Sequence, residues 1–224
     1  MEDDSWHGGI SDLMTGLMMI FLLIAISYML MVERSSVEIK KSAESVLEQG
    51  RVVKEIAATY SELQVGLYED LLSEFKNDLK KWDATLEKDS TIRFNEPDIL
   101  FEAGSSNLRE NFKNILHDFF PRYLSILTSE KYKIDIDEIR IEGHTSSIWE
   151  DAKTEAEIYL KNSRLSQERA HSVLAYCYQL DSSDSNHQWL HKVIRANGLS
   201  YGIPILNENG KEDRARSRRV EFKA

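Results

Sequence analysis

A run of twenty uncharged residues near the N-terminus, residues 13–32, constrains this chain more than any other feature. An α-helix rises about 1.5 Å per residue, so about 20 apolar residues cross the hydrocarbon core of a bilayer. The leader before the run is acidic, the run exceeds the apolar part of a signal peptide, and no small-residue cleavage site follows it. We therefore expect one uncleaved transmembrane helix over residues 10–33, after a tail of residues 1–9.

The charges beside this run bear on its orientation, because Lys and Arg favour the cytoplasmic side of a span. The tail before the run has neither, whereas Arg34, Lys40 and Lys41 follow it. Glu33 and Glu38 lie among these bases, but acidic residues have little weight in the rule. The local charges therefore predict that the C-terminal part is cytoplasmic.

Composition excludes several classes of function. The 224 residues leave room, beyond the span, for one ordinary domain and a connector. The net charge of −10 argues against a nucleic-acid surface, which needs a basic footprint. The single cysteine, Cys177, excludes an intramolecular disulfide and lies in a helical pattern, which predicts a buried thiol. No phosphate-binding loop or catalytic motif occurs, and His187 and His191 lack a third zinc ligand, so we expect no enzyme, metal or cofactor site.

Residues 34–89 have the pattern of a helical connector without proline. Their apolar positions alternate in spacing between four and three, as along a coiled-coil seam. The stripe begins with Ile39, Ala43, Val46, Val53, Ala57 and Tyr60, with Gly50 in the remaining position. It then widens through Leu63, Leu67, Leu71, Phe75, Leu79, Trp82 and Leu86. Its partner is either a second copy of the chain, giving a parallel homodimer, or the chain's own following domain.

Residues 90–224 alternate between strand and helix patterns. Alternation of apolar and polar residues predicts strands over residues 91–96, 98–106, 137–145 and 218–223. Helical periodicity predicts helices over residues 107–128, 163–180 and 186–198. Pro121 should kink or break the first helix, and Gly198 should cap the last. The predicted fold class is an α/β sandwich with helices on one face of a mixed sheet, behind the transmembrane helix and the connector.

Four motifs in residues 90–224 resemble the OmpA-like peptidoglycan-binding domain. They are ILFEAGSSNL, IEGHTSS, NSRLSQERAHSV and RSRRVEF. The N-terminal stretch ISDLMTGLMMIFLLI resembles the B subunit of the flagellar stator, MotB, and more closely ZorB, the MotB-like subunit of Zorya anti-phage systems. The resemblance implies an ion-conducting, peptidoglycan-anchored stator subunit of a proton-driven motor in phage defence, with a flagellar stator subunit as the alternative.

The resemblance also implies a binding site for the peptide stem of the glycan. The diaminopimelate in that stem carries an ammonium group and carboxylates, and Arg169 matches the family's arginine, whose planar fork suits a carboxylate. The implied binding residues are Thr145, Ser146, Asn162, Leu165, Ser166 and Arg169. Asn162, Leu165 and Ser166 match residues that shape the loop and cap a helix expected to begin near Leu165.

This site departs from the family pattern at one position, because Ser146 follows Gly-His-Thr where the family usually has aspartate. Either Glu150 or Asp151 supplies the missing acid, or the wall contact is weakened or altered. The fold would then serve as a dimerisation or anchoring module without tight binding. Arg218 and Arg219 match the arginine pair that opens the family's last strand, where at least one supports the binding loop; a solvated basic edge is the alternative.

Asp12 stands at the edge of the apolar run, and two interpretations are open. Ser11 or Asp12 could cap the helix by accepting from the amides of its first turn. Alternatively, ionising an aspartate at membrane depth costs at least about 2.5–3.5 kcal/mol, which favours a group that exchanges protons. The match to the stator aspartate implies that Asp12 carries the ion, and Thr15, one turn further on, is a possible neighbour on the ion path.

The resemblance implies partners and a location as well. Two copies would lie inside a ring of MotA-like or ZorA-like membrane subunits and attach to peptidoglycan, with no nucleic acid. The chain would cross the bacterial inner membrane once, with a cytoplasmic N-terminus and a periplasmic C-terminal domain, against the local charges. The opposing interpretation is a passive OmpA-like envelope tether with no ion role. A TolR-like or ExbD-like energiser fits less well, because those proteins lack an OmpA-like domain.

Overall fold

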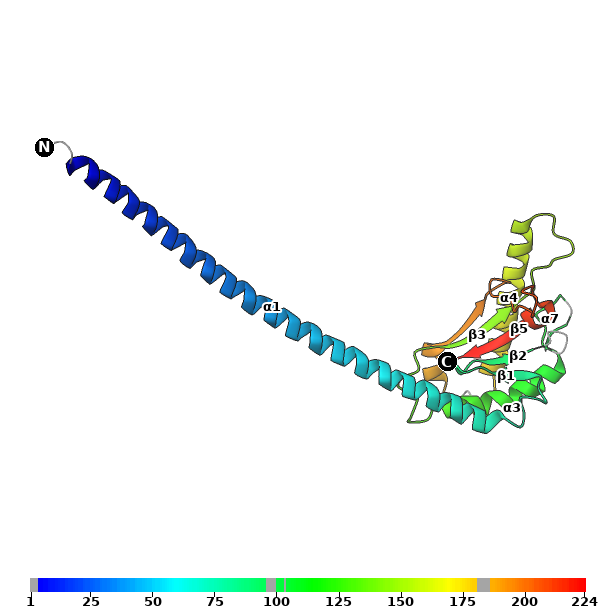
Figure 1. Ribbon diagram of the computed structural model, residues 1–224. Helices are drawn as coiled ribbons and strands as arrows, with labels where there is room; N and C mark the ends of the chain where they lie inside the picture. Colours follow the sequence, from blue (N-terminus) through cyan, green and yellow to red (C-terminus); the bar gives the residue numbers. More distant parts are fainter. Residues whose placement is uncertain (1–3, 96–99, 103, 181–185) are drawn as a thin grey trace. The chain divides into compact units, whose positions relative to one another are not determined.

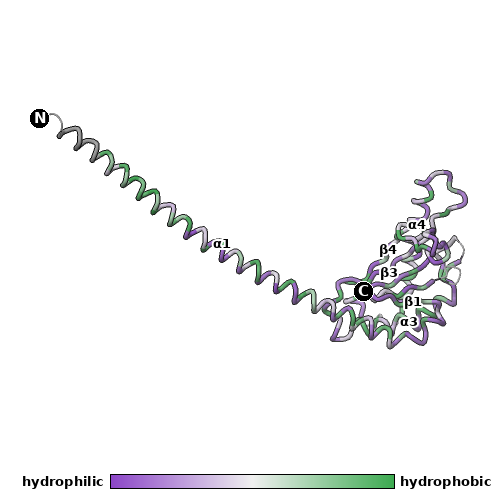
Figure 2. Tube along the Cα trace, viewed as in Figure 1, coloured by the Kyte–Doolittle hydropathy of each residue, from purple (hydrophilic) through white to green (hydrophobic). Residues whose placement is uncertain are grey.

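Helix α1 (Asp4–Phe75) runs through both units of the chain, which are Met1–Tyr60 and Ser61–Ala224. The computed structural model describes residues 4–95, 100–102, 104–180 and 186–224, with side chains from residue 13 onward. Among these residues, α1 is the one helix long and apolar enough to cross a membrane, with a mean hydropathy of 2.3 over its most apolar stretch. Figure 2 shows this stretch of the helix in the colour of hydrophobic residues. The apolar run thus forms the helix that its length predicts.

The second unit contains a mixed sheet of five strands within the described residues, in the order β1-β2-β5-β3-β4 (Figure 1). The strands are β1 (Ala84–Leu86), β2 (Ile92–Phe94), β3 (Ile139–His144), β4 (Ile194–Gly198) and β5 (Arg219–Lys223). Strands β3 and β4 are parallel, and the other neighbouring pairs are antiparallel. The predicted mixed sheet is confirmed.

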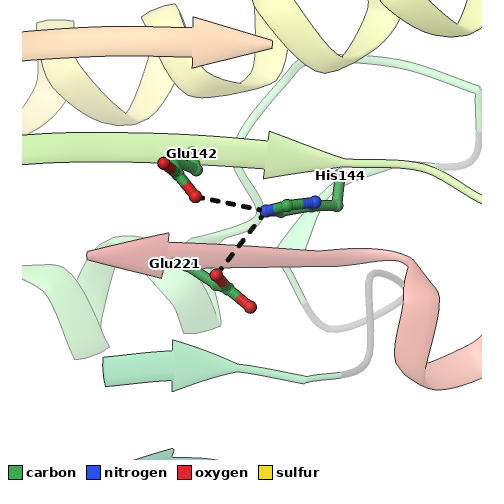
Figure 3. A group of neighbouring side chains, drawn as sticks. All are labelled: Glu142, His144 and Glu221. Carbon is green, nitrogen blue, oxygen red and sulfur yellow. Dashed lines mark ion pairs between the residues drawn. The ribbon is translucent and has the colours of Figure 1, made fainter. Parts of the chain in front are cut away.

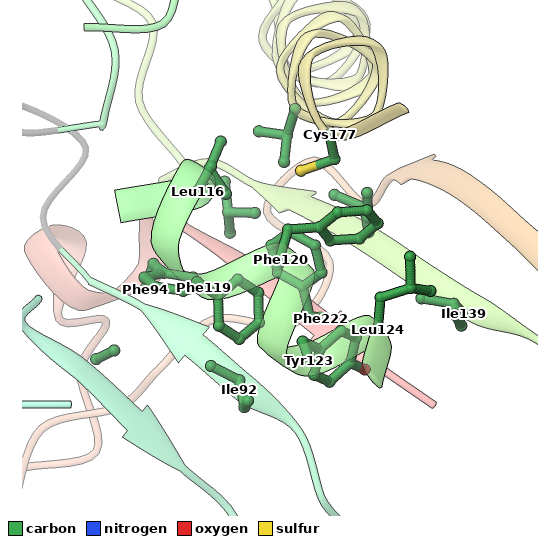
Figure 4. Packing of buried hydrophobic residues seen from close by; sticks show 14 of the residues in the cluster. Ile92, Phe94, Leu116, Phe119, Phe120, Tyr123, Leu124, Ile139, Cys177 and Phe222 are labelled. Atoms are coloured by element: carbon green, nitrogen blue, oxygen red, sulfur yellow. The ribbon is translucent and has the colours of Figure 1, made fainter. Parts of the chain in front are cut away.

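Alternation along the strands gives the sheet one apolar and one charged face. The apolar face carries the buried side chains Ile92, Phe94, Ile139, Ile141, Val220 and Phe222. Helices α3 (Glu110–Leu127) and α4 (Glu155–Tyr178) pack against this face (Figures 1 and 4). Two short helices, α6 (His187–Val193) and α7 (Arg214–Ser217), lead into β4 and β5. Cys177 of α4 is buried in the core, as its pattern predicts.

Phe119 of α3 lies at the centre of an aromatic core (Figure 4). Its ring centroid is 5.2 Å from those of Phe75 and Phe94, 5.1 Å from that of Tyr123 and 5.0 Å from that of Phe222. These rings come from α1, β2, α3 and β5, so one side chain joins four elements. Each aromatic pair contributes about 0.5–1.5 kcal/mol beyond the area that it buries.

The apolar stripe of the connector divides between two environments. Leu67, Leu71 and Phe75 are buried in the core of the second unit, so this part of the stripe packs on the chain's own domain. Arg122 of α3 holds the same end of α1 through Glu74, at 2.7 Å. The stripe before residue 61 stays exposed. Helix α1 ends at Phe75, and β1 lies inside the range that the pattern predicted to be helical.

Three other segments differ from the sequence predictions. The predicted helix over residues 186–198 is wrong in its second half, because α6 ends at Val193 and residues 194–198 form β4. The predicted strand over residues 98–106 lies partly outside the described residues, and its described part forms an isolated bridge between Phe101 and Leu108. Pro121 lies inside α3 and does not end it.

Gly143 and Gly198 allow α4 to lie directly against β3 and β4. A Cβ atom on Gly143 would lie 2.3 Å from the carbonyl oxygen of Ser166, and one on Gly198 would lie 2.3 Å from the amide nitrogen of Gln167. Both neighbours are backbone atoms of α4, so neither can rotate away. The approach of α4 to the sheet therefore depends on the absence of these two side chains.

We expect Gly143→Ala to destabilise the second unit by about 3 kcal/mol or more, because the added methyl group overlaps helix backbone. Denaturant unfolding of the full chain in detergent, followed by tryptophan fluorescence, measures this effect. Gly50→Ala is the matched control, because a Cβ atom there meets nothing within 4 Å. Equal unfolding midpoints for Gly143→Ala and wild type would contradict the close-packing argument.

Candidate functional site

A hollow of about 650 Å³ opens beside the carboxyl end of β3. Its lining residues come from the loop after β3, from one face of α4, from α7 and its vicinity, and from one glycine. They are Thr145, Ser146, Ile148, Trp149, Glu150, Asp151, Asn162, Leu165, Arg169, Arg214, Arg218 and Gly104. Five of the six predicted binding residues therefore meet around one hollow. The sixth, Ser166, lies behind it.

Helix α4 begins at Glu155, well before the predicted start at residues 163–165, and this changes the role of its residues. Its N-cap is Thr154, whose hydroxyl accepts from the amide of Glu157 at 3.2 Å, while the Glu157 carboxylate accepts from the amide of Lys153 at 2.8 Å. The prediction that Asn162, Leu165 and Ser166 cap a helix near Leu165 is therefore wrong. Asn162, Leu165 and Arg169 instead share one face of the helix interior, because three and four residues separate them.

Ser166 fixes the frame of the hollow. Its side chain is fully buried, and its hydroxyl donates to the carbonyl of Ser163 and accepts from the amide of Ser200 at 3.0 Å. The carbonyl of Ser200 accepts in turn from the amide of Thr145 at 2.9 Å. Ser200 adopts a left-handed conformation, with φ +53°, which brings its amide and carbonyl to these two partners. Ser166 thus links α4 to the loop that carries Thr145 and Ser146.

Arg169 is held in place although it lines the hollow. It is 6% exposed, its Nε donates to the carbonyl of Ser105 at 3.0 Å, and its guanidinium lies 4.8 Å from the ring centre of Phe101. A guanidinium oriented by a backbone acceptor and an aromatic ring is prepared for a planar anion such as a carboxylate. Arg169 can therefore bind an acidic group without a large loss of side-chain entropy.

The arginine pair before β5 separates into two roles. Arg218 lines the hollow, whereas Arg219 is buried and its Nε donates to the carboxylate of Glu221 at 2.6 Å. Arg219 also donates to the carbonyls of Ile203 and Ser217, so it holds the chain that leads into β5. Arg218 contributes positive charge to the hollow, and Arg219 stabilises the backbone that leads into β5.

The charged face of the sheet contains a buried group that the sequence analysis missed: Glu142, His144 and Glu221 (Figure 3). The Nε2 atom of His144 lies 3.6 Å from a carboxylate oxygen of each glutamate. Two carboxylates and an imidazole at this spacing are potential metal ligands. However, the Lys223 ammonium lies 2.7 Å and 3.2 Å from the same two oxygens, and therefore occupies the position that a cation would take. We interpret the group as part of an ion-pair network.

This network stabilises the end of β3 and the start of β5, which both adjoin residues that line the hollow. His144 directly precedes Thr145, and Glu221 holds Arg219, which follows Arg218. Burial by itself would raise the pKa of the Glu221 carboxyl, but the adjacent His144 and Arg219 side chains, with Arg93, outweigh it and hold that pKa well below its usual range. The sequence signal that could have found this network is a glutamate among the alternating residues of two predicted strands, in IEGH and in RVEF.

Glu221→Gln should destabilise the fold by about 3–5 kcal/mol at neutral pH, because it leaves Arg219 buried without its anion. A carboxyl whose pKa is lowered by folding stabilises above its unfolded pKa, so wild-type stability should fall as the pH drops below about 5. Urea unfolding at several pH values should show a flatter acid dependence for Glu221→Gln. Glu110→Gln, at an exposed surface pair, is the control, and the same acid dependence in both variants would contradict this account.

The position of Asp12 in α1 excludes one interpretation of that residue. Helix α1 begins at Asp4, eight residues before Asp12. Ser11 and Asp12 therefore lie beyond the first turn, where amides already have carbonyl partners within the helix. The alternative that Ser11 or Asp12 caps the helix is wrong. Thr15 follows Asp12 by three residues, which places both on one side of α1.

Comparison with known proteins gives the family. The OmpA family matches residues 100–218. The Zorya protein ZorB of Escherichia coli is 42% identical over 223 residues, which cover 99% of this chain and 88% of that protein. This chain belongs to the ZorB family and carries an OmpA-family domain. Neither is a family of enzymes, in agreement with the sequence analysis.

Two solved structures are also similar. A putative MotB-like protein from Desulfovibrio vulgaris shares 22% identity, with 72% of this chain and 90% of that chain covered and a TM-score of 0.49. The cell wall anchor of the T6SS from Pseudomonas aeruginosa shares 23% identity, with 68% and 94% covered and a TM-score of 0.46.

Proposed function

We propose that this chain is a stator-like subunit that anchors an ion-driven membrane motor to peptidoglycan. The observation that carries the proposal is the hollow around Arg169, in a chain whose α1 contains a membrane-length apolar stretch. Membership of the ZorB family supports the combination of a span with a wall-binding domain. The purpose that this relationship favours is phage defence.

The proposed wall contact uses the hollow. Arg169 binds a carboxylate of the peptide stem, and Asn162 and Leu165 form the adjacent wall on the same face of α4. Thr145 and Ser146 offer hydroxyl groups from the loop after β3. Ser166 acts behind them as a positioning residue, through its hydrogen bond to Ser200.

The proposed ion carrier is Asp12, with Thr15 as its neighbour on the ion path. An ionisable group inside a helix at membrane depth is costly when charged, so it favours exchange of a proton over permanent ionisation. Each proton that crosses 100 mV releases about 2.3 kcal/mol. This energy can drive a conformational step if the surrounding subunits pack differently around the charged and the neutral carboxyl.

The proposed assembly contains two copies of the chain inside a ring of MotA-like or ZorA-like subunits. Val46 and Val53 of the connector stripe are each 64% exposed and require a partner. Arg51 forms ion pairs with Glu48 and Glu55, at 2.8 and 3.7 Å, on the side of α1 away from this stripe, which leaves the apolar side open for a second copy. The assembly lies in the inner membrane, with the N-terminus cytoplasmic and the OmpA-family domain periplasmic.

Asp12→Asn should abolish phage protection, because the amide cannot exchange a proton, whereas Arg169→Ala should abolish it by releasing the wall. A plaque assay on cells that express the chain with its neighbouring membrane subunit measures both, beside a motility assay. Glu33→Gln, which removes a charge directly after the uncharged run of residues 13–32, should protect normally. Full protection by Asp12→Asn would refute the motor and leave a passive tether. Loss of motility instead of protection would favour a flagellar role.

Val53→Cys should form disulfide-linked or cross-linked dimers, because residue 53 lies on the stripe, and Glu55→Cys, on the opposite side, should not. The native Cys177 is buried and does not compete. A membrane-impermeant cross-linker applied to intact spheroplasts also tests the orientation, since only a periplasmic connector reacts. Equal cross-linking of both variants would contradict the parallel dimer, and reaction only after lysis would contradict the proposed orientation.

A further inference from the structure

The charges around the hollow come from different parts of the fold. Arg169 belongs to α4, and Arg214 and Arg218 belong to α7 and the residue after it. The two carboxylates, Glu150 and Asp151, belong to the loop after β3. A hollow with guanidinium and carboxylate groups on separate segments matches a ligand that carries both an anion and a cation.

The acidic loop is held at both of its ends. Ser147 donates from its amide to the Glu212 carboxylate at 3.0 Å, and its hydroxyl donates to the same carboxylate. At the other end, the Thr154 cap fixes the start of α4. Between them, the amide of Ala152 donates to the carbonyl of Trp149 at 3.2 Å, which closes a turn around residues 150 and 151. The two carboxylates therefore lie on a formed turn at the edge of the hollow.

Neither acid has another role within the described part of the chain. Glu150 and Asp151 are exposed and form no ion pair or side-chain hydrogen bond among the described residues. By contrast, Glu221 in the same unit is paired with Arg93 of the neighbouring strand β2 and with Arg219. The two carboxylates are therefore available to a ligand in a hollow that three arginines also line.

A second observation points independently to a ligand. The Thr145 side chain lines the hollow and is only 3% exposed, yet its hydroxyl has no hydrogen-bond partner among the described residues. Buried hydroxyl groups are almost always paired, because an unpaired one loses its water without compensation. A polar group of a bound ligand would supply the partner.

We infer that Glu150 and Asp151 bind the ammonium group of an amino acid side chain whose carboxylate is held by Arg169. This inference rests on the proposed wall contact and names its cationic half. Ser146, at the position where an acid is expected, can offer only a hydroxyl. The loop after β3 thus determines specificity for a zwitterionic stem residue over one that lacks the free amine.

Titration of the full chain in detergent with two soluble muropeptides tests the inference. One carries diaminopimelate with its free side-chain amine, and the other is identical except that this amine is acetylated. Wild type should bind the free-amine ligand about tenfold more tightly, the difference typical of a charge-assisted hydrogen bond. Glu150→Gln combined with Asp151→Asn should lose this preference and leave affinity for the acetylated ligand unchanged.

Two further variants separate failure of the inference from failure of the proposed function. Arg169→Lys, which keeps the charge but not the fork, should weaken both ligands, and Glu168→Gln, which removes an acid outside the hollow, should change neither. If the double variant keeps the tenfold preference while Arg169→Lys weakens binding, the loop acids are not the ammonium site and wall binding stands. If wild type binds neither ligand, the proposed wall contact fails and the inference fails with it.

Discussion

The contact between α4 and the strands below it is the constraint on which the candidate site depends. Gly143 and Gly198 bring the backbone of α4 to a distance that no side chain could share. This approach helps to set the position of Arg169 relative to Thr145, because Arg169 lies on α4 and Thr145 directly follows β3. A packed interior resists small displacements, so the geometry of the hollow follows from the backbone contact more than from its own polar groups.

The apolar face of the sheet contributes to stability, whereas the charged face positions the ends of the strands. The aromatic core around Phe119 joins four elements and lies within the hydrophobic core of the unit. The opposite face contains Glu142 and Glu221 among basic side chains, and an apolar replacement of such networks is often no less stable. The network instead positions the ends of β3 and β5. His144 directly precedes Thr145 and Arg219 directly follows Arg218, and both Thr145 and Arg218 line the hollow.

Sequence patterns predicted the membrane-length helix and the mixed sheet, because apolar periodicity is a local signal, whereas the family resemblance implied six binding residues, five of which line the hollow. The patterns failed where tertiary contacts decide. Residues 194–198 continue a helical pattern, yet they pair with β3 as a parallel edge strand. The start of α4 was available in the sequence, since Thr154 and Glu157 have the spacing of a capping box, although the Glu157 carboxylate accepts from the amide of Lys153. The motif around Leu165 instead led to a predicted start that was too late. The network of Glu142 and Glu221 joins strands that are distant in sequence, so alternation within IEGH and RVEF places each glutamate on one face of its strand but does not show that the two meet.

A motor that reacts against the cell wall needs an attachment that outlasts each step. One hollow of about 650 Å³ with exposed acids offers only a moderate contact, because water competes for every charge at its edge. Two copies of the chain joined along α1 would present two such hollows to one polymer. The second contact then forms at the effective concentration set by the first, which can strengthen attachment by a factor of about 10²–10⁴ without any new interaction. The proposed dimerisation through the stripe before residue 61 and the proposed wall contact in each hollow would therefore be complementary, since a reversible single contact would permit assembly and a double contact would resist torque.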